Sequence, residues 1–211
     1  MPADTSQDDP ILVLASGSAI RRQLLTESGL TVRPHPVPLD EAALRDQLTE
    51  GGATPGRMAL ELAHAKARLA AHAVNGDHGA DPIILAADQI LSCDGQIYGK
   101  PTDLPHARRQ LLALRNRTHA LHTAIVLFRG STPLWSHLET PRMTMRAFSE
   151  HFLDNYLAAE GATLLDCVGA YRLEGRGAQL FTTIDGTYDA VLGLPRLPLF
   201  QALRAHGILA T

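Results

Sequence analysis

The chain has 211 residues, of which 45% are hydrophobic and 5% aromatic, enough for one large domain or two small lobes around a mostly aliphatic core. Its formal net charge of −3 argues against a protein that coats nucleic acid, because such proteins are usually basic. No apolar run approaches the roughly 20 residues of a membrane helix. Cys93 and Cys167 lie outside any CxxC pair, as free thiols of the cytosol usually do. We therefore expect a cytoplasmic protein that binds neither a membrane nor nucleic acid.

The N-terminal residues 1–9 contain three Asp and no Lys or Arg. They lack the basic start and the apolar stretch of a signal peptide. We expect a short disordered tail there, with a single two-lobed domain over residues 10–211.

The first predicted elements are a strand, a tight turn and a helix. Four bulky apolar residues at 11–14 predict a buried strand, and the small residues 15–18 predict the turn. Ile20 and Leu24 then recur at helical spacing, which predicts a helix over 19–28.

The turn has the composition of an anion site. Ser18 is a good N-cap, and Ser16 and Gly17 precede it beside the free N–H groups of a helix N-terminus. Arg21 and Arg22 lie in the first helical turn, where the helix dipole disfavours cations, so a bound anion would offset that cost. The alternative is a solvated arginine pair on an ordinary turn.

Two helices follow a short strand at 30–32 and an extended, proline-containing stretch. The first, at 41–49, opens with Asp40 and Glu41, which either cap the helix or serve a site. The second begins at Pro55 and runs to about residue 72. Lys66 lies at the edge of its apolar stripe, where it either extends its charge to solvent or points into a cleft.

A second buried strand is predicted at 82–87, after a polar loop at 75–81, and it ends at Asp88 and Gln89. A hairpin turn at 93–96 and the tripeptide that contains Lys100 come next. Because α/β proteins place chemistry at the carboxyl ends of buried strands, Asp88 is a candidate catalytic residue. The alternative is a simple turn former.

The rest of the chain is predicted to contain further helices and strands. We expect a helix at 103–114, strands at 119–128 and 134–148, a helix at 149–160, a mobile or closely packed glycine-rich region at 161–179, a strand at 180–184 and a last helix ending at 206. His119 and His122 invite a metal site, but residues three apart on a strand face opposite sides and are poor co-ligands.

Several charged residues surround the predicted turns. The acidic ones are Asp40, Glu41 and Asp88, and the basic ones are Arg21, Arg22, Lys66 and Lys100. Carboxylates can hold Mg²⁺, cations can neutralise phosphates, and a free carboxylate can activate water. No Walker motif and no GxGxxG sequence is present, so the set indicates a different kind of triphosphate site.

Five groups of residues in order resemble the Maf-type nucleoside triphosphate pyrophosphatases, over roughly residues 11–208. The groups are Leu14 to Ser18 with Arg21, Arg22, Leu24 and Leu25; Leu62, Ala63, Lys66 and Ala67; Ala87 to Gln89 with Gly99 to Pro101; Gly169 to Tyr171 with Glu174 and Gly175; and Val191 to Pro195. Together and in this order they are a specific signature.

The resemblance implies the α/β fold of Maf and Ham1 (inosine triphosphatase-like) proteins, with a long bent mixed sheet, flanking helices and two lobes around a central cleft. It also implies cleavage between the α- and β-phosphates of a nucleoside triphosphate, a divalent metal cofactor, Mg²⁺ or Mn²⁺, and a homodimer.

By the same resemblance, Asp88 is the proton acceptor, with Lys66, Lys100 and Arg21 in the catalytic set. Glu41, together with Asp88, is implied to hold the metal. The phosphate-binding residues are Ser16, Gly17, Ser18 and Arg22.

The family divides by nucleotide, and Gln89 with Glu174 resembles its 7-methyl-GTP branch rather than its dTTP/UTP branch. A carboxylate at Glu174 can accept from guanine N1–H and the N2 amine. Ala19 stands where the family commonly has Pro, and Ile20 where this branch commonly has Trp, which can stack on a cationic base. These departures leave the chemistry intact but put the base preference, and the role of Ile20 in it, in question.

Two other classes remain. A non-enzymic regulator of division or nucleic-acid binding is disfavoured by the negative net charge. A serine hydrolase using Ser16 or Ser18 is disfavoured because neither serine lies in a GxSxG elbow.

Overall fold

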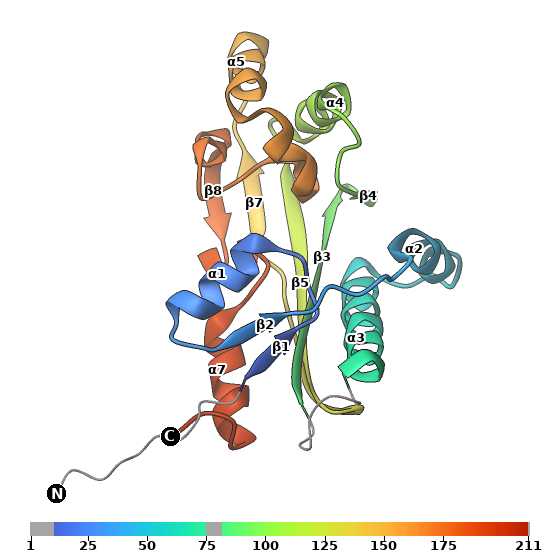
Figure 1. Cartoon of the computed structure of the whole chain (residues 1–211). Helices are drawn as coiled ribbons and strands as arrows, with labels where there is room; N and C mark the ends of the chain where they lie inside the picture. The colour runs from blue at the N-terminus through green and yellow to red at the C-terminus, as the bar shows by residue number, and fades with distance from the viewer. Residues whose placement is uncertain (1–10, 75–81, 211) are drawn as a thin grey trace, which may run out of the picture.

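The computed structural model describes residues 11–74 and 82–210 (Figure 1). Its centre is an eight-stranded sheet with the order β2-β1-β3-β5-β7-β8, in which β4 pairs with β3 and β6 with β5. The strands are β1 (Leu12–Leu14), β2 (Val32–Pro34), β3 (Ile83–Cys93), β4 (Gln96–Tyr98), β5 (Thr118–Arg129), β6 (Thr132–Glu139), β7 (Arg142–Met145) and β8 (Phe181–Asp185).

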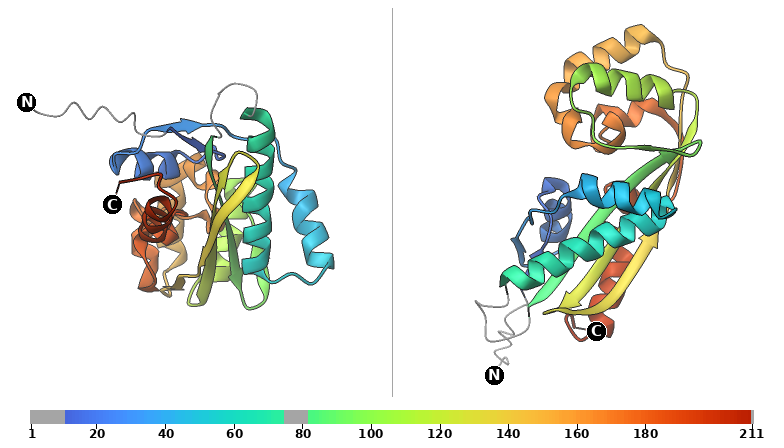
Figure 2. Two further views of the ribbon diagram at one scale, coloured as in Figure 1. Left: turned by 90° about the horizontal axis from the view of Figure 1, so that it is seen from below. Right: turned by 90° about the vertical axis from the view of Figure 1, so that its right-hand side faces the viewer.

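Helices cover the sheet. They are α1 (Ala19–Glu27), α2 (Glu41–Glu50), α3 (Pro55–Val74), α4 (Leu104–Leu114), α5 (Glu150–Glu160), α6 (Tyr188–Val191) and α7 (Arg196–Ala205), with 3₁₀ turns η1 (Gly161–Asp166), η2 (Val168–Ala170) and η3 (Arg176–Leu180). Figure 2 shows α4 and α5 at one end of the long strands, with α1, α2, α3 and α7 at the other.

The sheet is mixed, because β1 runs parallel to β2 and β3 while the remaining pairs are antiparallel. Its longest ladder joins β3 to β5, from Ile83 opposite Arg129 to Ser92 opposite Ala120. The predicted α/β class, with a long mixed sheet flanked by helices, is therefore confirmed.

Three apolar clusters form the core. One lies at the α4 and α5 end, and the other two lie around β1, β3 and β5 at the opposite end. Figure 2 shows α3 on one face of the sheet there and α7 on the other. Met58, Leu62, Ala63 and Ala67 are fully buried along α3, since they recur at helical spacing on the face that packs on the sheet.

Side chains cap the N-termini of several helices, among them the predicted cap Ser18 of α1. The backbone N–H of Arg21 donates to the Ser18 hydroxyl, and Asp40 and Ser149 cap α2 and α5 in the same way. Asp103 caps α4, because its side chain accepts from the backbone N–H of His106. Each cap satisfies a backbone N–H that has no partner within its helix.

The predicted end of the strand that carries Asp88, the candidate catalytic residue, is wrong. β3 does not end at Asp88 but continues to Cys93, because Ile90, Leu91 and Cys93 are buried and the ladder with β5 persists. Asp88 lies opposite Ala124 in mid-strand, so its position is set by the register of the sheet and not by a turn.

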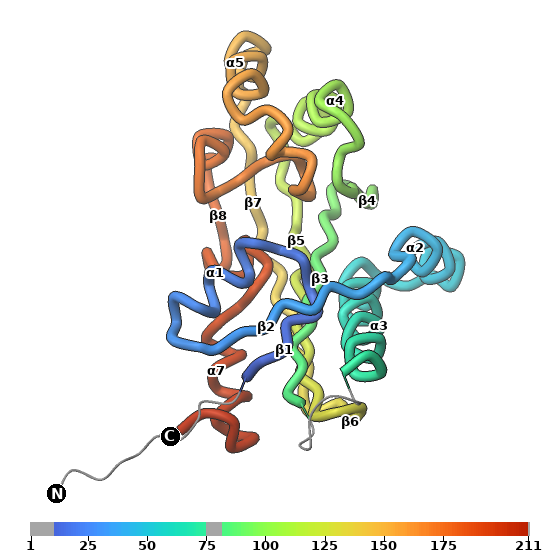
Figure 3. The backbone as a smooth tube through the Cα atoms, viewed as in Figure 1, coloured from blue at the N-terminus to red at the C-terminus, as the bar shows by residue number. Residues whose placement is uncertain are grey.

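Other expectations in the second half are refined. The stretch 134–148 is not one strand: it divides near Pro141 into β6 and β7, which pair with different parts of β5. Figure 3 shows β6 at the end of the sheet away from α4 and α5. Residues 161–180 contain three 3₁₀ turns and pack closely, because a Cβ at Gly169 would lie 2.6 Å from Leu91 Cδ1. The short helix α6 was not predicted.

The predicted tail, residues 1–9, and the loop at 75–81 lie outside the described residues. Within the described ranges, no helix is both long and apolar enough to cross a membrane. The two cysteines are free, as expected. His119 contacts Tyr171 whereas His122 contacts Ser92, as expected for side chains on opposite faces of a strand.

Candidate active site

The centre of the candidate site is the ammonium group of Lys66, which joins two carboxylates. Its Nζ lies 2.6 Å from Oδ1 of Asp88 on β3 and 2.8 Å from Oε1 of Glu41, the first residue of α2. The side chains of Lys66 and Asp88 are 12% and 8% exposed, whereas that of Glu41 is 41% exposed. Lys66 therefore points into the protein and joins residues far apart in sequence.

The two carboxylates have opposite pKa shifts. Burial is the largest influence on Asp88 and raises its pKa, helped by Glu41 and opposed by Lys66 and Arg21. Burial also raises the pKa of Glu41, but Lys66, Arg45 and Lys100 outweigh it, so the net shift is downward. A raised pKa makes a carboxylate a stronger base, while the lowered one keeps Glu41 ionised.

Arg21 fixes the turn after β1 against the sheet. Its Nη1 donates to the Ala87 carbonyl oxygen at 3.1 Å and to Ser16 Oγ at 3.3 Å, and its Nε donates to the Gly193 carbonyl oxygen at 2.8 Å. Burial lowers the pKa of Arg21, against the opposing influence of Asp88 and Glu41. Since a guanidinium stays protonated in proteins, Arg21 is a partly buried positive charge whose electrostatic influence reaches Asp88.

The remaining residues of the predicted phosphate loop line the same turn. Gly17 and Arg22 are exposed, and Ser16 and Ser18 are partly buried. The backbone N–H of Ser18 donates to Ser16 Oγ at 3.2 Å. Both hydroxyls are thus engaged in shaping the turn, which disfavours either serine as a nucleophile.

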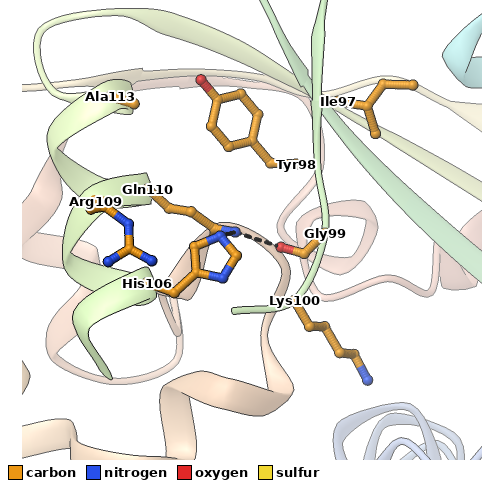
Figure 4. Close-up of a pocket in the computed structure, with 8 residues that line it drawn as sticks. All are labelled: Ile97, Tyr98, Gly99, Lys100, His106, Arg109, Gln110 and Ala113. Atoms are coloured by element: carbon orange, nitrogen blue, oxygen red, sulfur yellow. Dashed lines mark hydrogen bonds between the residues drawn. The ribbon is translucent and has the colours of Figure 1, made fainter. Parts of the chain in front are cut away.

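Lys100 follows β4 and is exposed. Its charge lowers the pKa of Glu41, so it belongs to the electrostatic environment of the site without a direct contact. Figure 4 shows the cavity beside it, of 460 Å³, with the Lys100 side chain directed away from Tyr98 and Gln110. The dashed line marks the hydrogen bond from Gln110 Nε2 to the Gly99 carbonyl oxygen, 3.0 Å long.

A second cavity, of 430 Å³, shares Ile97 and Gly99 with the first and includes Arg45 of α2. Asp88 lines neither of these two cavities. We place the site by its converging charges rather than by cavity size, because catalysis depends on charged groups held in position.

The three predicted specificity residues, Ile20, Gln89 and Glu174, each contact other parts of the described chain, and no hydrogen bond joins one to another. Gln89 Nε2 donates to Thr123 Oγ1 at 2.7 Å and to two carbonyl oxygens of α6, so this amide is committed to the protein. Glu174 is exposed and accepts from Arg172 Nε at 3.1 Å. Ile20 packs against the apolar cluster around β1 and α7.

Sequence reasoning missed two residues of the site. Arg45 lies one helical turn after Glu41 and donates from Nε to the Glu41 carbonyl oxygen, at 3.2 Å; this spacing was a usable signal. Gly193 accepts from Arg21, and no local pattern pointed to that contact because the two residues are 172 apart in the chain.

The donor set fits a hard divalent cation. Among residues 11–74 and 82–210, no three His, Cys, Asp or Glu side chains form a metal-binding cluster. Mg²⁺ requires no such cluster, since it is usually held by one or two carboxylates and the phosphates of a substrate. Glu41 and Asp88, which share the ammonium of Lys66, can supply those carboxylates.

Comparison with known proteins finds relatives that are named as pyrophosphatases. A Gluconobacter oxydans protein named nucleoside triphosphate pyrophosphatase is 51% identical over 94% of this chain and 96% of its own length. A Rhizobium meliloti protein named 7-methyl-GTP pyrophosphatase is 42% identical over 94% of this chain and 97% of its own length.

Among solved structures, a HAM1 protein from Coxiella burnetii is similar with a TM-score of 0.45 and 20% identity, over 66% of this chain and 74% of that one. The sequence model of the family described as Maf-like protein matches residues 11–206. Because that match covers nearly the whole chain, and because both relatives align over 94% of it, the protein belongs to the Maf-like family.

Proposed function

We propose that this protein is a nucleoside triphosphate pyrophosphatase, a hydrolase that acts on an acid anhydride. It hydrolyses the bond between the α- and β-phosphates and releases a nucleoside monophosphate and pyrophosphate. Membership of the Maf-like family and the names of its relatives support this proposal. The observation that carries it is the convergence of Asp88, Lys66 and Glu41 next to the Arg21 turn.

Asp88 is the proposed general base. Oδ1 is held by Lys66, which leaves Oδ2 to accept a proton from water. The water oxygen attacks the α-phosphorus, the bond to the bridging oxygen breaks, and that oxygen leaves with pyrophosphate. The raised pKa of Asp88 brings its basicity closer to neutral pH, which favours this proton transfer.

The cations bind and orient the triphosphate. Lys66, Lys100 and Arg21 balance its negative charge, while Ser16 to Ser18 and Arg22 shape an anion-binding turn at the N-terminus of α1. Glu41 with Asp88 would hold Mg²⁺ or Mn²⁺, which neutralises phosphate charge when bound. Holding the reacting groups in place supplies much of the expected rate enhancement.

7-Methyl-GTP is the proposed substrate, with Glu174 accepting from the guanine edge. Its support is the pair Gln89 and Glu174, and relatives 40–43% identical that are named 7-methyl-GTP pyrophosphatases. A dTTP/UTP pyrophosphatase is the alternative, because Ile20 cannot stack on a methylated base as Trp can.

The test is hydrolysis of 7-methyl-GTP, GTP, UTP and dTTP side by side with Mg²⁺, measuring both monophosphate and pyrophosphate. We expect 7-methyl-GTP to have the largest kcat/KM. Faster hydrolysis of UTP or dTTP would support the alternative. Release of orthophosphate in place of pyrophosphate, or resistance to EDTA with sensitivity to serine-directed reagents, would refute the proposed reaction.

We also propose a homodimer in the cytoplasm, on the family resemblance. Light scattering after gel filtration would give twice the chain mass of 22.7 kDa for a dimer, and a value equal to that mass would refute it.

A further inference from the structure

A C-terminal segment, residues 190–193, is tied to one neighbour of Asp88 through Arg21. The Ala87 carbonyl oxygen accepts a hydrogen bond from Nη1 of Arg21, and Nε of the same guanidinium donates to the Gly193 carbonyl oxygen. The guanidinium therefore links the strand that carries Asp88 to this segment.

The other neighbour of Asp88 is tied to the same segment. Nε2 of Gln89 donates to the carbonyl oxygens of Ala190 and Val191, each at 3.1 Å. The fully buried Thr123 hydroxyl also donates to the Ala190 carbonyl oxygen, at 2.8 Å. Residues 190–193 thus hold β3 on both sides of the proposed base.

Gly193 is the one position in this segment where a side chain would disturb the site directly. Its φ is +86°, a conformation that L residues rarely adopt. A Cβ there would lie 2.9 Å from Nη2 and 3.1 Å from Nε of Arg21. The missing side chain makes room for the guanidinium, while the carbonyl oxygen of Gly193 binds it.

We infer that Gly193 is a positioning residue for the proposed reaction, because it holds the Arg21 guanidinium against the Ala87 carbonyl and so fixes the strand at Asp88. The inference rests on the proposed function and deepens it. Displacing a catalytic group by about 1 Å can cost about 100-fold in rate. A single methyl group at residue 193 should therefore lower the rate strongly if it moves Arg21 and the strand at Asp88.

The first test compares Gly193→Ala with a matched control, Gly29→Ala. Gly29 has φ +82°, but a Cβ there meets nothing within 4 Å, so both variants carry the same backbone strain and only one meets Arg21. We expect Gly193→Ala to lower kcat about 10- to 100-fold, with KM changed far less. Gly29→Ala should keep wild-type kcat; an equal loss in both variants would overturn the inference.

A double-mutant cycle with Arg21→Lys separates positioning from a general structural effect. If Gly193 acts through Arg21, the double variant should be about as active as the worse single variant, because the same contact is lost once. Multiplied losses would show independent effects and would overturn the inference.

Labelling with phenylglyoxal, mapped by mass spectrometry, gives a readout that does not need activity. We expect faster labelling of Arg21 in Gly193→Ala than in the wild type or Gly29→Ala. Thr123→Val, which removes the hydroxyl bond to Ala190, should have a smaller effect in the same direction and serves if Gly193→Ala does not fold. Unchanged labelling would overturn the inference, whereas a wild type inactive on every nucleotide would instead refute the proposed function.

Discussion

At the scale of single residues, the proposed chemistry depends on charges that are expensive to bury. Asp88 and Lys66 are nearly inaccessible, and each is stabilised by the other. The raised pKa of Asp88 follows from burial that Lys66 does not fully offset. Such perturbed groups concentrate at functional sites, which is why we assign the base to Asp88 and not to Asp40, the exposed cap of α2.

We predict that Asp88→Asn lowers kcat by about 10²- to 10⁴-fold, because an amide cannot accept the proton of the attacking water. Pyrophosphate release at saturating substrate measures the effect. Asp94→Asn is the matched control, since Asp94 is exposed in the hairpin between β3 and β4. Turnover of Asp88→Asn equal to that of the wild type would remove Asp88 from the mechanism.

Lys66→Met should destabilise the protein by roughly 3 kcal/mol, because it removes the ammonium group that pairs directly with the buried Asp88 carboxylate. This is the low end for a broken buried pair, since Glu41 remains 41% exposed and is screened by solvent. Urea unfolding at pH 7 gives the value. Arg57→Ala, which removes an exposed pair with Glu61, should change the free energy of unfolding by less than about 1 kcal/mol.

At the scale of elements, long-range pairing overrides local signals. The polar pair at 88 and 89 predicts a strand end, yet β3 passes through it because ten consecutive residues pair with β5. Gln89 tolerates this interior position because three acceptors surround its amide. The helices were easier to predict, since their caps and apolar stripes are local in sequence.

The contact between His119 on β5 and Tyr171, the residue after η2, predicts a pH-dependent stability. Nε2 of His119 lies 2.8 Å from the Tyr171 hydroxyl oxygen in the core. Burial there lowers the pKa of His119 to about 4. The unfolded chain binds a proton below about pH 6.5 and the folded protein only near pH 4, so stability falls as pH drops through that window, by about 3 kcal/mol in all.

The free energy of unfolding, measured with urea at several pH values between 7 and 4, should therefore fall less with decreasing pH in His119→Gln than in the wild type. His72→Gln, at an exposed position of α3, should follow the wild type. If the free energy of unfolding fell equally with pH in all three proteins, His119 would not be the group responsible.

At the scale of the whole molecule, the site draws on several elements. β3 carries Asp88, α3 carries Lys66, α2 carries Glu41, and Lys100 follows β4. Under the proposed function, a bound triphosphate would contact groups from these elements together, so we expect binding to stabilise the folded protein.

With Mg²⁺ and an α,β-methylene triphosphate at about 100 times its Kd, we expect about 2.7 kcal/mol of stabilisation, and thus a Tm about 5–10 °C higher. Scanning calorimetry measures the shift. Lys100→Ala should reduce it at the same ligand concentration, while Arg204→Ala, an exposed residue of α7 that lines neither cavity, should not. Equal shifts in both variants would exclude Lys100 from the phosphate site.

The sequence by itself determined the strand, turn and capped helix of residues 11–28, the helix of Lys66, the set of acidic and basic residues, and the family. These depend on local spacing and capping, which are readable along the chain. Only the tertiary structure decided that Asp88 lies in mid-strand, that Lys66 joins it to Glu41, that Gln89 holds α6, and that Arg21 rests on Gly193. Those facts depend on sheet register and on contacts between residues far apart in the chain, which no local pattern encodes.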